Sequence, residues 1–117
     1  MIDKLKDLKE RICRFAEERD WDQYHSPKNL AMALIVETAE LVEHFQWMTQ
    51  EESRSLPPEK LSKVEAELAD ILIYLVRIAD KLDIDLHQAT MEKLQQNADK
   101  YPVEKVHGLS KKYTEYP

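Results

Sequence analysis

The chain has 117 residues, 43% of them hydrophobic and 34% charged, which suits one soluble domain over residues 1–117 with a single core. Its net charge of −6 repels a polyphosphate backbone, so duplex nucleic acid is not an expected partner. Gly108 is the single glycine, which excludes glycine-rich phosphate loops and dinucleotide fingerprints and disfavours a sheet built from tight hairpins. We therefore expect an all-α protein.

Apolar residues recur at helical spacing through most of the chain. The segment between the first two helices is polar and aromatic, and the segment before the third is rich in Glu and Ser and ends in Pro57 and Pro58. Four predicted helices joined by such segments are typical of a four-helix bundle. An extended polar tail over residues 103–117 follows them. The predicted helices span residues 2–19, 27–48, 58–82 and 85–100.

Two of these helices have clear start signals. Ser26 followed by Pro27 provides an N-cap hydroxyl and a proline in the first turn. Asp85 and Gln88 have the spacing of a capping box, with Asp in place of the usual Ser or Thr.

The predicted helix 58–82 is apolar nearly all round between Leu68 and Ala79. Such a helix must be covered on several sides, by its own chain or by a second copy, so self-association is expected. Its longest uncharged run, Ile71–Val76, is too short to span a membrane. Because Cys13 has no partner cysteine and the N-terminus lacks the apolar core of a signal peptide, we expect a cytoplasmic protein.

Four carboxylates fall on or beside the apolar faces of the second and third predicted helices. On a helical wheel Glu37 lies between Leu30, Leu34 and Leu41, and Glu40 is on the same side one turn along. Burying a lone carboxylate costs several kcal/mol, so each must be protonated, paired or bound to a metal. The other two carboxylates, Glu67 and Asp70, stand beside Tyr74 and next to the apolar stripe of helix 58–82.

Cations that pair with these carboxylates are scarce in the first two helices, and the nearest candidates are Arg77 and Lys93. A cage of four carboxylates suits a hard divalent cation, Mg²⁺ or its substitute Mn²⁺. Salt-bridged helix faces without a metal are the simpler alternative. A redox di-iron site is disfavoured, because the chain's one Glu-x-x-His pair, Glu104 and His107, lies in the tail.

The chain also resembles a known family. The motif E-x-x-E at 37–40 followed by E-x-x-D at 67–70 resembles the signature of the MazG-like all-α nucleoside triphosphate pyrophosphohydrolases. The strings F-A-E-E-R-D-W (15–21), E-L-V-E-H-F-Q-W (40–47), D-I-L-I-Y-L (70–75), N-A-D-K-Y-P (97–102) and S-K-K-Y-T-E-Y-P (110–117) look like its dCTP pyrophosphatase branch. The resemblance implies Mg²⁺-dependent cleavage between the α and β phosphates of dCTP, its modified forms or related deoxynucleotides, releasing monophosphate and pyrophosphate for nucleotide-pool sanitation.

The resemblance also implies a homodimer or homotetramer, and it implies residue roles. The four carboxylates Glu37, Glu40, Glu67 and Asp70 would be the catalytic Mg²⁺ ligands, and one of them or a neighbour would orient the attacking water. Aromatic rings suit a nucleobase, and basic or amide groups suit its phosphates. The family's animal members carry a histidine where this chain has Ile12, so base choice is expected to be looser here. The implied substrate-binding residues are Trp21, Asp22, Gln23, Tyr24, His25, Trp47, Tyr74, Lys93, Asn97, Lys100 and Tyr101.

Two further interpretations follow from the same residues. His44 lies one turn after Glu40 and is predicted to pair with that carboxylate. The apolar residues around the circumference of helix 58–82 are equally compatible with a non-catalytic helical module that binds a partner through this helix.

Overall fold

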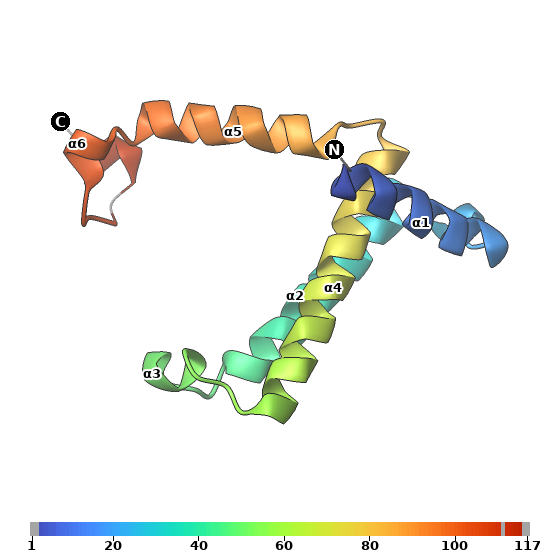
Figure 1. Ribbon diagram of the computed structural model, residues 1–117, viewed down its shortest axis with the longest axis horizontal. Coiled ribbons are helices and arrows are strands. Elements are labelled where there is room, and N and C mark those ends of the chain that lie inside the picture. Colours follow the sequence, from blue (N-terminus) through green and yellow to red (C-terminus); the bar gives the residue numbers. More distant parts are fainter. Residues whose placement is uncertain (1–2, 111, 116–117) are drawn as a thin grey trace. The chain divides into compact units, whose positions relative to one another are not determined.

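The computed structural model describes residues 3–110 and 112–115, and their regular secondary structure is helical (Figure 1). The prediction of an all-α protein is confirmed. The second helix ends three residues earlier than predicted, and short helices stand where none was predicted, one before the third predicted helix and one in the tail. The α-helices are α1 (Lys4–Glu18), α2 (Pro27–Phe45), α3 (Gln50–Ser53), α4 (Pro58–Lys81), α5 (Leu86–Lys100) and α6 (Val103–Val106), and the 3₁₀ turns are η1 (Asp22–Tyr24) and η2 (Tyr113–Glu115).

The chain divides into two compact units, one ending at Ile84 and the other beginning at Asp85. The first unit holds α1 to α4, and the second holds α5 and α6 with the tail. A single domain over residues 1–117 stays a prediction.

Side-chain caps begin several of the helices. The hydroxyl of Ser26 accepts a hydrogen bond from the backbone N–H of Asn29, as the sequence predicts. Asp85 caps α5 by accepting from the N–H of Gln88, but the Gln88 side chain donates to Glu92 instead of completing a capping box. A reciprocal capping box is formed at α3, between Thr49 and Glu52.

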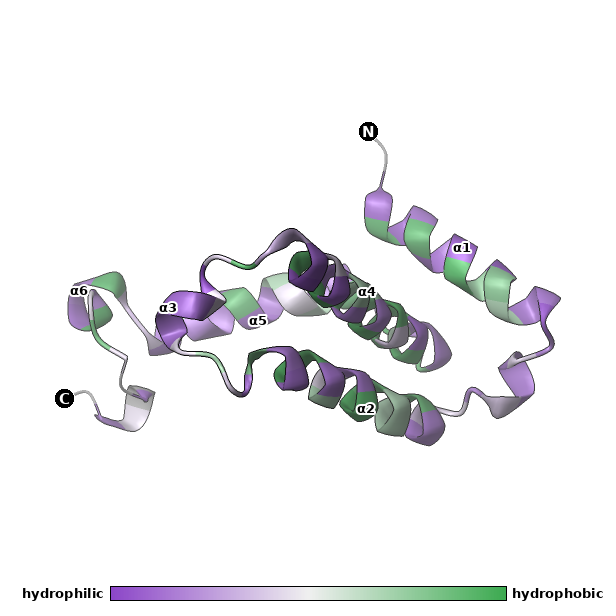
Figure 2. Cartoon of the chain, turned by 90° about the horizontal axis from the view of Figure 1, so that it is seen from below, coloured by the Kyte–Doolittle hydropathy of each residue, from purple (hydrophilic) through white to green (hydrophobic). Residues whose placement is uncertain are grey.

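The core of the first unit lies where α2 and α4 run side by side in opposite directions, with α1 packed against α4 (Figures 1 and 2). Its buried apolar residues are small or medium in size. Many larger apolar side chains remain exposed, among them Ile35 at 68% on α2 and Leu68 at 51% on α4. The buried apolar side chains are Ala16, Leu30, Val64, Val76 and Ala79.

None of the helices in the described ranges combines the length and the apolar character needed to cross a lipid bilayer.

Candidate functional site

Three of the four predicted carboxylates meet between α2 and α4. Each of Glu37, Glu67 and Asp70 offers a carboxylate oxygen, and these oxygens all lie within 4.8 Å of one another. The opposed packing of the two helices brings Glu37 beside a pair that sits one turn apart on α4. Glu37 and Glu67 are half-buried and Asp70 is exposed, so the cluster opens to solvent on one side.

The crowding of negative groups changes the chemistry of Glu37. Burial, hydrogen bonding with Glu67 and Glu40, and the charges of Glu40 and Asp70 raise the pKa of Glu37 from 4.5 to about 7. Glu40 is half-buried and lies outside the group of three, but its effect on Glu37 places it beside the cluster. In the absence of a cation, the cluster therefore holds a proton near neutral pH.

Glu67 is the least satisfied member of the cluster. Its Oε2 atom is buried and accepts no hydrogen bond from any group in residues 3–110 and 112–115. Its Oε1 lies 3.7 Å from Nε2 of His44. The prediction that His44 pairs with Glu40 is therefore wrong, because the partner in the structure is Glu67. A buried carboxylate oxygen without a donor is costly, and a divalent cation would satisfy it. The carboxylate set thus fits a hard metal ion.

Tyr74 stands next to the carboxylates. Burial raises the pKa of its phenol, and the charges of Glu37 and Asp70 raise it further. Tyr74 lies four residues after Asp70 on α4, so both side chains belong to one face of the helix. A neutral, half-buried phenol beside the acidic cluster offers an aromatic wall and a hydrogen-bond donor.

The predicted substrate-binding segment 21–25 lies between α1 and α2 and is tied to α4. Asp22 accepts from Nη2 of Arg77 at 2.6 Å and also pairs with Lys81, and these two cations lower its pKa. Gln23 donates to both the backbone carbonyl and the carboxylate of Asp20. The side chains of Asp22 and Gln23 therefore hold the segment in place.

The aromatic side chains of this segment are more accessible. The ring of Trp21 packs edge-on against Phe15, with centroids 5.7 Å apart, and lies 6.4 Å from the ring of His25. Trp21 is 44% exposed and Tyr24 is 62% exposed. Trp47, in the turn after α2, is 89% exposed and free of ring contacts within the described residues. Exposed rings of this kind can stack on a planar ligand.

Comparisons with known proteins identify the family. The model of the MazG-like family matches residues 32–116.

The chain belongs to the MazG-like family.

Curated relatives agree with this assignment. This MazG-like protein is 42% identical over 115 residues to dCTP pyrophosphatase 1 from Mus musculus and 41% identical to dCTP pyrophosphatase 1 from Homo sapiens. Each alignment covers 97% of this chain and 68% of the relative. The crystal structure of a pyrophosphatase from Archaeoglobus fulgidus matches with a TM-score of 0.81 at 36% identity, over 87% of this chain and 95% of that chain.

Family membership bears on two of the sequence-based interpretations. MazG-like pyrophosphatases generally depend on a divalent metal, which agrees with the acidic cluster. The relatives are enzymes, so a nucleoside triphosphate pyrophosphatase is favoured over a non-catalytic module that binds a partner through α4.

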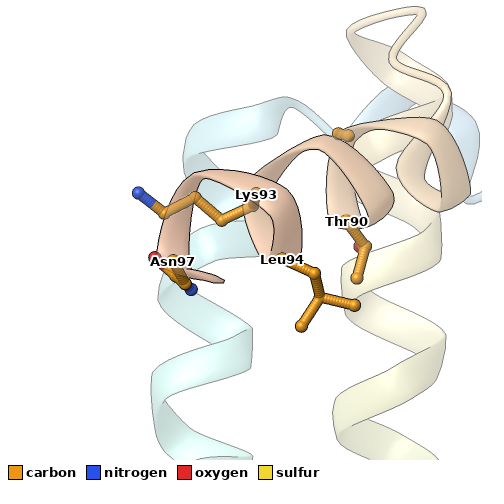
Figure 3. A pocket seen from close by; sticks show the side chains of 5 residues that line it. Thr90, Lys93, Leu94 and Asn97 are labelled. Atoms are coloured by element: carbon orange, nitrogen blue, oxygen red, sulfur yellow. The ribbon is translucent and has the colours of Figure 1, made fainter. Parts of the chain in front are cut away.

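The remaining predicted binding residues of this MazG-like protein lie in the second unit. Lys93 and Asn97 are four residues apart on α5 and line a shallow cavity of about 340 Å³ with Ala89, Thr90 and Leu94 (Figure 3). Lys100 is in the last turn of α5, and Tyr101 caps its C-terminus. A role for these four residues in phosphate binding stays a prediction.

The structure also reveals residues that the sequence reasoning missed. Arg77 was considered a partner for the four carboxylates, but it pairs with Asp22 and Asp80 instead. Lys81 joins the same network through Asp22. One signal was present in the sequence: Arg77 is the sole charged residue between Ile71 and Ala79, and an arginine inside an apolar run requires buried partners.

Proposed function

We propose that this protein is a Mg²⁺-dependent pyrophosphohydrolase that converts dCTP, or a modified form of it, to the monophosphate and pyrophosphate. The enzyme class and the nucleotide are supported by the dCTP pyrophosphatases that align over 97% of the chain. The observation that carries the proposal is the cluster of Glu37, Glu67 and Asp70 between α2 and α4. Its role is to hold the metal that accompanies the triphosphate.

The donor set explains the choice of metal. Glu37, Glu67 and Asp70 supply carboxylate oxygens, with Glu40 beside them, and Mg²⁺ prefers oxygen ligands, as does Mn²⁺. When bound, such a cation neutralises phosphate charge and activates water for attack on phosphorus. The attack forms a bond from the water oxygen to the α-phosphorus and breaks the bond to the oxygen that bridges to the β-phosphorus, so pyrophosphate leaves. The carboxylates accept the proton released by the water.

The chain's aromatic residues are proposed to bind the base. Asp70, Tyr74 and Arg77 are spaced i, i+4 and i+7 on α4, so one helix face runs from the acidic cluster to the segment that holds Trp21 and His25. This run rises ~10 Å along the helix axis. A nucleotide with its phosphates at Asp70 would extend its base toward Trp21. Trp47 is proposed as a second stacking surface, and Lys93, Asn97, Lys100 and Tyr101 as phosphate contacts.

We also propose that the protein self-associates and acts in the cytoplasm. The first unit leaves Met32, Ile35 and Leu68 more than half exposed, which supports burial against a second copy. The unpaired thiol of Cys13 supports a reducing compartment.

Release of pyrophosphate from the four common dNTPs, with Mg²⁺ and with EDTA, tests the proposed function. We expect turnover of dCTP that depends on Mg²⁺, and looser discrimination among bases because Ile12 stands where the family's animal members carry a histidine. Glu40→Ala is expected to abolish turnover while the helical circular dichroism signal is kept. The matched control is Glu43→Ala, which removes an exposed carboxylate one turn further along α2 and is expected to leave turnover unchanged.

Thermal unfolding gives an independent readout. Mg²⁺ with dCTP should raise the midpoint of the unmodified protein, because a ligand present at 100 times its Kd stabilises by about 2.7 kcal/mol. The absence of turnover with every dNTP, together with an unchanged midpoint, would contradict the proposed function. Full activity of Glu40→Ala would show that the assignment of this carboxylate is wrong.

A further inference from the structure

Arg77 is the buried charged residue of α4, and its partners come from three parts of the first unit: Cys13 on α1, the segment 21–25, and α4 itself. Its side chain is 4% exposed. Its Nη2 donates to Asp22 at 2.6 Å, its Nη1 donates to Asp80 at 3.3 Å, and its Nε donates to Nδ1 of His25 at 3.2 Å. The carboxylates of Asp22 and Asp80 balance the charge of the guanidinium. The third hydrogen bond in this list, to the ring of His25, is therefore not needed for charge balance.

That third bond fixes the position of the proton on His25. A guanidinium has donors and no acceptor, so Nδ1 of His25 must present a lone pair to Arg77. Burial lowers the pKa of His25, and the charges of Arg77 and Lys81 lower it further against the opposing charge of Asp22. The ring is therefore neutral, and its one proton is on Nε2.

The Nε2–H group is left available. Within the described part of the chain no hydrogen-bond partner of Nε2 is found, although His25 is half-buried. The neighbouring ring of Trp21, 6.4 Å away between centroids, offers a stacking surface that is 44% exposed. A hydrogen-bond donor beside an exposed aromatic face is suited to a planar heterocycle with an acceptor on its edge.

We infer that Arg77 is a positioning residue that holds His25 as the Nε2–H tautomer, so that His25 donates a hydrogen bond to an acceptor atom of the nucleobase. The O2 and N3 atoms of cytosine are acceptors of this kind. Arg77 itself touches neither base nor phosphate. The inference rests on the proposed function for the identity of the ligand, whereas the assignment of the tautomer does not.

The tautomer is measured by the long-range ¹H–¹⁵N correlation spectrum of the histidine rings at pH 7.5, with the signals of His25 assigned by their loss in His25→Gln. We expect a neutral ring with the proton on Nε2 in the unmodified protein. In Arg77→Met we expect a mixture of both neutral tautomers. Asp22 keeps Lys81 and Asp80 keeps Lys9 in that variant, so neither carboxylate loses all its partners.

Kinetics then separate positioning from a merely structural role. Arg77→Met should lower kcat/KM for dCTP by at least about tenfold, mainly through KM. His25→Gln provides an N–H donor near the place of Nε2 without needing a partner at Nδ1. In the His25→Gln background the further loss caused by Arg77→Met should therefore be less than about threefold. Lys81→Met, which removes the other cation on Asp22, is the matched control and should leave the tautomer of His25 unchanged.

Three results would overturn the inference: a proton on Nδ1, a doubly protonated ring at pH 7.5, or independent effects of Arg77→Met and His25→Gln on kcat/KM. The spectrum of the unmodified protein needs no variant, so the assignment is tested even if Arg77→Met does not fold. A protein that turns over no nucleotide but shows the Nε2–H tautomer would contradict the proposed function alone. Turnover of dCTP with the other tautomer would contradict the inference alone.

Discussion

The chemistry of Glu37 depends on its neighbours. A glutamate with a pKa of 4.5 would be ionised at neutral pH, whereas burial and the carboxylates around it raise the pKa of Glu37 to about 7. Metal binding must displace the proton that this group retains. The capacity of Glu37 to bind a metal in the folded protein therefore depends on pH near neutrality.

The raised pKa of Glu37 predicts opposite pH trends for the stability of the protein and for its affinity for metal. Between pH 4.5 and about 7 the folded state keeps a proton that the unfolded state has released. The contribution of Glu37 to the free energy of unfolding therefore falls as pH rises through this window. The affinity for Mg²⁺ should rise from about pH 6 to pH 8, because the ligand must be ionised.

Urea unfolding in EDTA at several pH values, for the unmodified protein and for Glu37→Gln, measures the first trend. The difference in the free energy of unfolding between the two proteins isolates the contribution of Glu37 from that of His25. The lowered pKa of His25 makes stability rise with pH, which is the opposite trend. Calorimetric titration with Mg²⁺ measures the second trend. A difference between the two proteins that does not change with pH would contradict the raised pKa.

At the scale of helices, α1 and α4 end in the same way. Asp20 and Asp83 have positive φ values of 55° and 56°, and each lies just beyond the last helical turn. The N–H of Ile84 bonds to the carbonyl of Ala79, and the N–H of Trp21 bonds to the carbonyl of Ala16. Both helices therefore end in a Schellman motif, in which glycine usually occupies the position with positive φ. They set the directions in which the chain leaves both helices.

Asp83→Gly is expected to raise the free energy of unfolding of the first unit by up to about 1 kcal/mol, because glycine adopts a positive φ without the steric cost borne by other residues. Asp83→Ala is the matched control. It removes the same carboxylate but keeps a Cβ atom, so it should give no gain. Chemical unfolding of the three proteins side by side provides the measurement, and equal effects of Gly and Ala would show that charge, and not backbone conformation, decides the outcome.

At the scale of the whole molecule, the first unit exposes many large apolar side chains, several of them on α2 and α4. On α2, Met32 is 59% exposed and Ile35 is 68% exposed, and on α4 Leu68 is 51% exposed. Figure 2 shows apolar residues recurring along both helices. Burial of this surface against a second copy would remove it from water.

Light scattering after size-exclusion chromatography should accordingly give a multiple of the 13.8 kDa chain mass at micromolar concentration. Ile35→Lys places a charge in this surface and should shift the protein toward the monomer. Val103→Lys, at a side chain that is 72% exposed on α6, is the control and should leave the mass unchanged. A monomeric unmodified protein would contradict self-association.

The helices and the presence of carboxylates on their apolar faces were predictable because each depends on local patterns. Apolar spacing gave α1, α2, α4 and α5 to within a few residues, and the wheel position of Glu37 marked a carboxylate that required a partner. The end of α2 at Phe45 and the short helix α3 were missed, since end positions depend on weak local preferences.

Partner choice among polar groups was decided by the tertiary structure alone. The sequence determined that carboxylates lie on apolar helix faces, because helical periodicity fixes the direction of each side chain. The opposed packing of α2 and α4 decided that His44 meets Glu67, and the placement of the segment 21–25 against α4 decided that Arg77 meets His25 and Asp22. Arg77 and His25 are separated by 52 positions in the chain, and such a contact follows from how helices pack, which no local pattern encodes.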